Sequence, residues 1–172
     1  MRLAKSGQWW INDPQRALAN NSATYTERPQ TEIFLKEWMS LIESKSGERG
    51  IFNKLAAIKK AESTGRRDAS KIAGTNPCAE ISLRSAGLCN LSEVVIRSTD
   101  TLEDLKYKVR IATIIGTYQS LLTDFKYIRP IWKQNQEDER LLGVSLTGIM
   151  DHPVLAQTMP LTNEWLRQLK QV

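Results

Sequence analysis

The apolar residues of this chain recur at helical spacing in some segments and cluster as in strands in others. The longest helical pattern follows Asp100-Thr101 and predicts a helix over about 101–125. Its apolar positions are Leu102, Leu105, Val109, Ala112, Ile115, Leu122 and Phe125. Shorter patterns predict helices from Pro29 to about Gly47, over about 52–62, from Pro130 onward, and over about 161–170.

Three segments have the composition of strands. Residues 89–96 (CNLSEVVI) end in three β-branched side chains, and residues 141–149 (LLGVSLTGI) contain only Ser and Thr as polar side chains. Residues 18–25 (LANNSATY) are a weaker candidate, because asparagine is unusual inside a strand. The order strand, helix, loop, strand, helix, strand predicts an α/β fold with a parallel sheet or barrel. Residues 1–17 are expected to be irregular.

Residues 63–79 have no apolar period and are rich in Ser, Thr, Gly, Arg, Asp and Pro. This composition predicts a loop that ends at Cys78 and Ala79. Loops of that length are uncommon in compact domains, and they are usually functional or disordered. Because this loop delivers a cysteine, we expect it to be functional.

Composition narrows the classes of protein to consider. The 172 residues are 41% hydrophobic and 25% charged, enough for one domain with a core. The net charge of +5 is scattered along the chain, so no nucleic-acid partner is expected. No apolar run approaches the ~18–20 residues that cross a membrane, and the N-terminus has no signal-peptide core. Two cysteines without an export signal predict a reducing cytoplasm, and with one histidine they predict no metal site.

The two cysteines, Cys78 and Cys89, admit three interpretations. A cysteine can simply be a small buried hydrophobe, which suits Cys89 at the start of an apolar strand better than Cys78 in a polar loop. A nucleophilic cysteine needs a base, but the single histidine, His152, lies in an Asp-His-Pro turn typical of a structural role. The third interpretation is redox or radical chemistry on a substrate. It is favoured by Asn76 and Glu80, which flank Cys78 at a spacing of two.

The spacing itself suggests how these three side chains would meet. In an extended chain, residues at i, i+2 and i+4 share one face, so Asn76, Cys78 and Glu80 would converge on one ligand. Pro77 restricts its own backbone and that of Asn76 and would stiffen the loop. Taken singly, Asn76 would be interpreted as a turn residue and Glu80 as a surface acid.

Two segments resemble motifs of one enzyme family. Residues 76–81 (NPCAEI) closely resemble the finger-loop motif of ribonucleotide reductases, and residues 89–94 (CNLSEV) resemble the strand that carries one of their reducing cysteines. The separation of eleven positions between the cysteines resembles the adenosylcobalamin-dependent class, whereas the di-iron class, which stays an alternative, has a wider gap. Further agreement lies in residues 16–22, 43–50 and 139–148.

The resemblance implies a fold and a chemistry. The fold would be part of a ten-stranded α/β barrel, with a finger loop over about 63–88. Cys78 would be the thiyl radical that abstracts the 3′-hydrogen of a ribonucleotide, Glu80 the general base on the 3′-hydroxyl, and Asn76 a substrate-binding residue. Cys89 would be half of the dithiol that reduces the substrate. Adenosylcobalamin would be the cofactor, and a thioredoxin-type protein the external reductant.

The chain departs from this family in length. We expect residues 1–172 to be a single partial catalytic-barrel domain, without the N-terminal and C-terminal parts of a whole reductase. Complementary reductase segments would then be partners, and the isolated chain would be inactive. The alternative from another class is an inactive remnant that serves as an assembly module.

Overall fold

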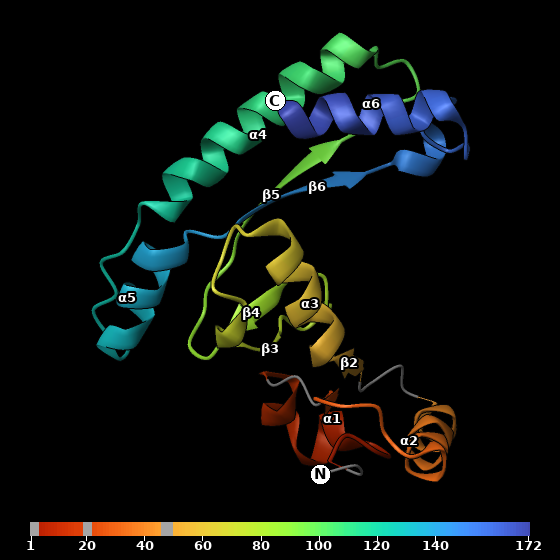
Figure 1. Ribbon diagram of the computed structural model, residues 1–172, viewed down its shortest axis with the longest axis vertical. Coiled ribbons are helices and arrows are strands. Elements are labelled where there is room, and N and C mark those ends of the chain that lie inside the picture. The colour runs from red at the N-terminus through yellow and green to blue at the C-terminus, as the bar shows by residue number, and fades with distance from the viewer. Residues whose placement is uncertain (1–3, 19–21, 46–49) are drawn as a thin grey trace. The chain divides into compact units, whose positions relative to one another are not determined.

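The computed structural model describes residues 4–18, 22–45 and 50–172, which form two compact units, Met1–Ala86 and Gly87–Val172 (Figure 1). Both units combine helices with short strands, which confirms the α/β class. The strands of the described residues form three two-stranded sheets. A ten-stranded barrel, and one catalytic-barrel domain over residues 1–172, stay predictions.

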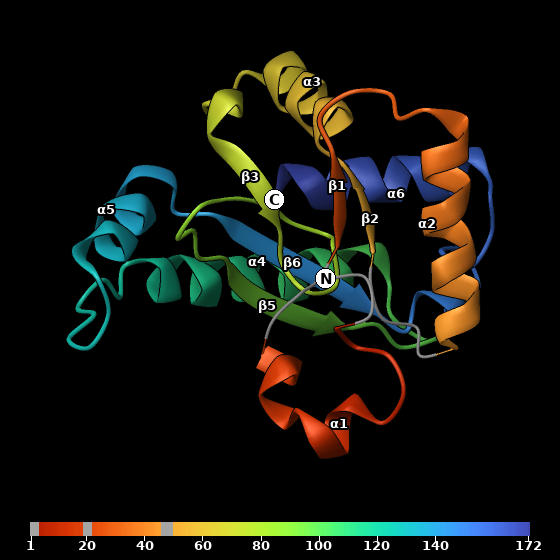
Figure 2. The same cartoon turned by 90° about the horizontal axis from the view of Figure 1, so that it is seen from below.

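The first unit contains one parallel and one antiparallel strand pair. Strand β1 runs parallel to β2, with Thr24 opposite Phe52 (Figure 2). Strands β3 and β4 are antiparallel and form a hairpin (Figure 1). The elements are α1 (Trp9–Asn12), a 3-10 helix (Pro14–Leu18), β1 (Ala23–Tyr25), α2 (Thr31–Ser44), β2 (Ile51–Asn53), α3 (Lys54–Thr64), a 3-10 helix (Ala69–Lys71), β3 (Ile72–Thr75) and β4 (Ser82–Arg84).

Several predictions for this unit were wrong. Residues 1–17 were expected to be irregular, but their described part, residues 4–17, includes α1 and most of a 3-10 helix. The strand expected over 18–25 is confined to Ala23–Tyr25, with residues 19–21 outside the described part. The helix expected over 52–62 begins at Lys54, because Asn53 ends β2 and its side chain accepts a hydrogen bond from the Ala56 amide.

The prediction of a loop over 63–79 is also wrong, because this segment contains a 3-10 helix and strand β3. Strand β3 was not predicted because it is short and contains a glycine, which is uncommon in strands, and its partner β4 is only three residues long. Helix α2 is confirmed, although Gly47, its expected end, lies outside the described residues.

The second unit is a β-α-β arrangement. Strand β5 (Asn90–Val95) pairs in parallel with β6 (Leu142–Thr147), and α4 (Leu102–Ser120) and α5 (Pro130–Glu139) lie between them in the chain. A 3-10 helix (Ile149–Asp151) and α6 (Pro160–Gln171) follow. Helices α4 and α6 lie on the same face of the sheet (Figure 1). The core between them contains Val94, Ile96, Leu105, Val109, Ala112, Leu155 and Leu169. The strands and helices predicted for this half are confirmed, with shifted ends.

Helix α4 shows where the apolar pattern succeeded and where it failed. Leu105 is fully buried, but Ile115 and Leu122, expected on the same stripe, are 57% and 70% exposed. The helix ends at Ser120 rather than near 125. Its start is fixed by a capping box, in which Thr101 and Asp104 each accept a hydrogen bond from the other's backbone amide.

His152 has a structural role in this unit, as its turn position predicted. Its side chain is 2% exposed, and its ring centroid lies 5.4 Å from that of Trp165. Nδ1 accepts hydrogen bonds from the amides of Val154 and Leu155, so Nε2 carries the proton and donates to the Asp100 carbonyl at 2.9 Å. Both ring nitrogens are therefore engaged, and His152 is not a base for a cysteine nucleophile.

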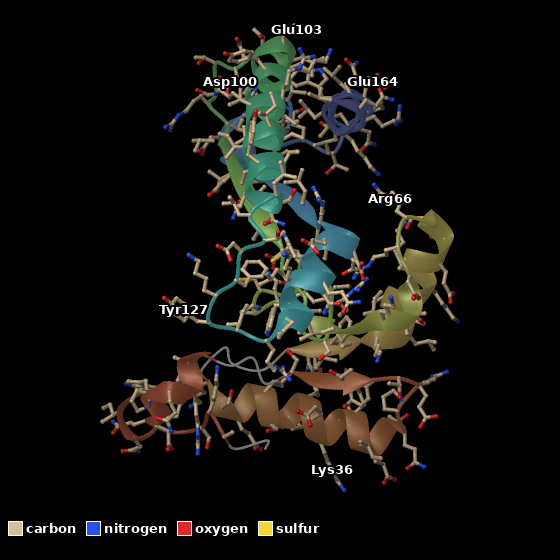
Figure 3. The ribbon with its side chains drawn as sticks, turned by 90° about the vertical axis from the view of Figure 1, so that its left-hand side faces the viewer. Lys36, Arg66, Asp100, Glu103, Tyr127 and Glu164 are labelled. Carbon is tan, nitrogen blue, oxygen red and sulfur yellow. The ribbon has the colours of Figure 1, made fainter. Side chains whose placement is uncertain are left out.

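Asp100 supports a pH-dependent prediction. Its carboxylate accepts hydrogen bonds from Lys108 Nζ at 2.6 Å and from the Arg97 amide at 2.8 Å, beside the first turn of α4 (Figure 3). The Lys108 hydrogen bond, against an opposing effect of desolvation, lowers the pKa of Asp100 below its ordinary value. The unfolded chain therefore binds more protons, so the stabilisation is complete above about pH 4 and is lost as pH falls through the folded pKa.

We expect Asp100→Asn to lower the melting temperature near neutral pH by a few degrees, because the charged partner of Lys108 is lost. The difference from wild type should shrink as the pH drops below about 4. Thermal unfolding followed by circular dichroism from about pH 7 to pH 2.5 measures this. A difference that stays constant over that range would contradict the assignment.

Candidate active site at the tip of a hairpin

Hairpin β3–β4 carries the Asn-Pro-Cys-Ala-Glu-Ile segment at its tip. Thr75 lies opposite Ser82, and a bulge occurs between Ile72 and Gly74. Ile72, at the base, is 1% exposed and comes directly after the 3-10 helix Ala69–Lys71, in which Ala69 is buried. The hairpin therefore projects from a packed base, and the tip is held by short-range backbone pairing.

Asn76 closes the tip through three hydrogen bonds. Its amide donates to the Ile81 carbonyl at 3.1 Å, and its carbonyl accepts from the Ala79 amide at 3.0 Å. The backbone carbonyl of Asn76 is thus used by the Ala79 amide. The Ile81 amide donates to the side-chain oxygen of Asn76, also at 3.0 Å. Asn76 is 8% exposed. An asparagine followed by proline suits this turn, since proline presets the second position.

The tip is a turn and not extended, so the expectation that residues 76, 78 and 80 share one strand face is wrong. Ala79 has φ = 67°, a left-handed conformation that costs a non-glycine residue about 1 kcal/mol. The turn puts Cys78 and Glu80 in exposed positions while Asn76 is buried. The structure therefore brings all three residues to one tip, with Asn76 Oδ1 bonded inside it.

The two cysteines lie in different environments and in different units. Cys78 is an exposed free thiol, so the interpretation as a buried hydrophobe does not apply to it. Cys89 is half-buried and lies just before β5 rather than within it. The roles of Cys78, Glu80, Asn76 and Cys89 stay predictions.

The sequence did not reveal how the hairpin is anchored. Arg67 Nη1 donates to the Ser82 carbonyl at 2.6 Å and joins the segment after α3 to the start of β4. The neighbouring Asp68 accepts from the Ser70 hydroxyl at 2.6 Å, which holds the pKa of Asp68 below its ordinary value. Neither residue belongs to a recognisable motif. The role of Asn76 could have been inferred from the Asn-Pro pair, a common turn opening.

The described residues contain no cluster of side chains suited to hold a metal ion. Across residues 4–18, 22–45 and 50–172, no three His, Cys, Asp or Glu side chains are grouped to hold a metal ion. The single histidine uses both ring nitrogens within its own unit.

Comparison with known proteins supports one family. The chain is 32% identical over 121 residues to the adenosylcobalamin-dependent ribonucleoside-triphosphate reductase of Lacticaseibacillus paracasei. This chain is similar to a reductase. The similarity covers 66% of this chain but only 15% of the relative, so the chain spans a small part of that enzyme's length. No protein-family model and no solved structure matches the chain.

No helix in the described part of the chain combines the length and the apolar character that a membrane span requires.

Proposed function

We propose that this chain is part of the catalytic barrel of an adenosylcobalamin-dependent ribonucleotide reductase, and that Cys78 carries the thiyl radical. The observation that supports it is the exposed Cys78 thiol at a tip closed by Asn76, in a chain similar to such a reductase. An exposed sulfur on a tip fixed by hydrogen bonds can approach a sugar without rearranging the backbone.

The proposed reaction uses three side chains of this chain. The Cys78 thiyl takes the 3′-hydrogen atom, which forms an S–H bond and leaves a carbon radical. Glu80 accepts the 3′-hydroxyl proton while the 2′-hydroxyl takes a proton from the reducing dithiol and leaves as water. Cys89 and a cysteine outside these 172 residues form that dithiol, which also gives a hydrogen atom to C2′ and becomes a disulfide. The remaining electron goes to the 3′-ketone, and Glu80 returns its proton to the 3′-oxygen. Cys78 finally returns its hydrogen atom to C3′, which regenerates the thiyl, and a thioredoxin-type protein reduces the disulfide.

The cofactor would supply the initial radical, and this chain would supply the thiol that receives it.

The test is complementation. The chain is mixed with the two portions of the L. paracasei reductase that flank its matched 121 residues, each as a purified polypeptide. We expect deoxyribonucleotide formation that requires adenosylcobalamin, all three polypeptides and a dithiol. The isolated chain should give none. Assembly without product would overturn the proposal in favour of an inactive assembly module, and activity that needs a di-iron subunit instead would assign the other class.

A further inference from the structure

The tip that holds Cys78 is directed by the two strands beneath it. Thr75 and Ser82 are the last paired residues of hairpin β3–β4, and residues 76–81 form the tip between them. The hydrogen bonds of Asn76 described above fix the internal shape of the tip. They do not fix the direction in which the hairpin points, which depends on what holds β3 and β4 to the rest of their unit.

Strand β3 starts from a packed base. The Asp68 carboxylate accepts hydrogen bonds from the Ser70 amide at 3.1 Å and from the Ser70 hydroxyl at 2.6 Å, which caps the 3-10 helix before the strand. Ile72 follows that helix and is 1% exposed. The register of the hairpin then shifts between Ile72 and Gly74, and such a bulge bends a strand. The base of β3 therefore does not by itself fix the direction of the tip.

Arg67 holds the other strand at the point where the tip ends. Its Nη1 donates to the Ser82 carbonyl at 2.6 Å, a short hydrogen bond from a charged donor. Nε and Nη2 of the same guanidinium are buried. A guanidinium is planar and rigid, so a buried one fixes the direction of its acceptor better than a flexible ammonium group would. Because β4 is only three residues long, a bond at its first residue strongly affects its direction.

We propose that Arg67 is a positioning residue for ribonucleotide reduction, because its bond to the Ser82 carbonyl sets where the tip holds the Cys78 sulfur. This inference rests on the proposed function. Cys78 lies three positions beyond Thr75, a reach of up to about 10 Å. A rotation of the last strand pair by about 6–10° therefore moves the sulfur by about 1 Å. A displacement of that size at a reacting atom lowers the rate by about 10²-fold.

The same geometry distinguishes this role from substrate binding. Nη1 of Arg67 is engaged with a backbone carbonyl and its other guanidinium nitrogens that the structure buries are turned away from solvent, whereas the preceding Arg66 is exposed (Figure 3). Loss of a positioning residue lowers kcat at an unchanged KM, and loss of a substrate-binding residue raises KM. Loss of a residue that only stabilises the fold lowers the melting temperature and changes neither constant.

The kinetic test uses the three-polypeptide mixture with Arg67→Ala, Arg67→Lys and the matched control Arg66→Ala, which removes the same charge from the adjacent, exposed position. We expect kcat to fall by about 10²-fold in Arg67→Ala and by about tenfold in Arg67→Lys, with KM for the ribonucleotide within about twofold of wild type. Arg66→Ala should keep both constants. Melting curves of the isolated chain confirm that each variant folds.

The position of the tip can also be measured without substrate. Nitroxide labels are attached to Cys78 and to the cysteine introduced by Lys60→Cys on α3, which packs against β3, in a Cys89→Ser background. Pulsed electron paramagnetic resonance then gives the distribution of distances between the labels. We expect Arg67→Ala to broaden or shift this distribution and Arg66→Ala to leave it as in wild type.

Three results would overturn the proposal. A raised KM with an unchanged kcat would make Arg67 a substrate-binding residue. An unchanged kcat and KM with a lowered melting temperature would leave Arg67 a role in stability alone, and the proposed function would stand. If the wild-type mixture is inactive although the relative's own 121-residue segment restores activity, the proposed function fails and this inference fails with it.

Discussion

Cys78→Ser is expected to abolish ribonucleotide reduction by the complemented enzyme, by ~10³-fold or more, because a serine hydroxyl does not form the radical that a thiol forms. The substitution should leave the melting temperature within about 1 °C of wild type, since Cys78 is exposed. Deoxyribonucleotide formation is measured by chromatography, and folding by circular dichroism. Activity above a few per cent of wild type would remove Cys78 from the radical role.

Cys89→Ser is the matched control for this experiment. It changes the other cysteine of the chain in the same way, but it should block re-reduction rather than radical formation. We therefore expect it to stop multiple turnover while a thiyl radical still forms on Cys78, detectable by electron paramagnetic resonance. Normal multiple turnover in Cys89→Ser would show that Cys89 is not part of the reducing dithiol.

Asn76→Ala is expected to lower activity by about 10²-fold through the position of Cys78, because a displacement of about 1 Å at a reacting atom has an effect of that size. The variant removes the acceptor for the Ile81 amide, whose 3.0 Å hydrogen bond closes the tip. Losing it should cost about 1 kcal/mol of unfolding free energy. Hydrogen exchange at the Ile81 amide should accelerate in the isolated chain, a readout that does not depend on substrate.

Two comparisons separate positioning from substrate binding. Asn76→Asp keeps an acceptor oxygen, so it should restore slow exchange at Ile81. Asn53→Ala removes a similar side-chain bond at the start of α3, at 3.0 Å from the Ala56 amide, and should lower stability without changing Ile81. If Asn76→Ala leaves Ile81 exchange unchanged, the tip does not depend on this side chain, and any loss of activity comes from substrate contact.

The site was only partly predictable from the sequence. The Asn-Pro-Cys-Ala-Glu segment could be recognised because its residue types are unusual together, and the exposure of Cys78 agrees with that interpretation. The arrangement of residues 76, 78 and 80 could not be predicted from the alternation of side chains in an extended strand, because the turn at Ala79 bends the segment. Arg67 carried no local signal, since its bond to Ser82 spans 15 positions.

The sequence alone determined the α/β class, the positions of the long helices and the cysteine motif, because helical periodicity and residue chemistry are local properties of the chain. Tertiary structure alone decided which apolar residues are covered: Leu105 is buried, whereas Ile111 and Ile115 on the same helix border an open groove. It also decided that the short strands β2, β3 and β4 exist at all. Burial and strand pairing depend on partners distant in the chain, and no periodic pattern encodes these partners.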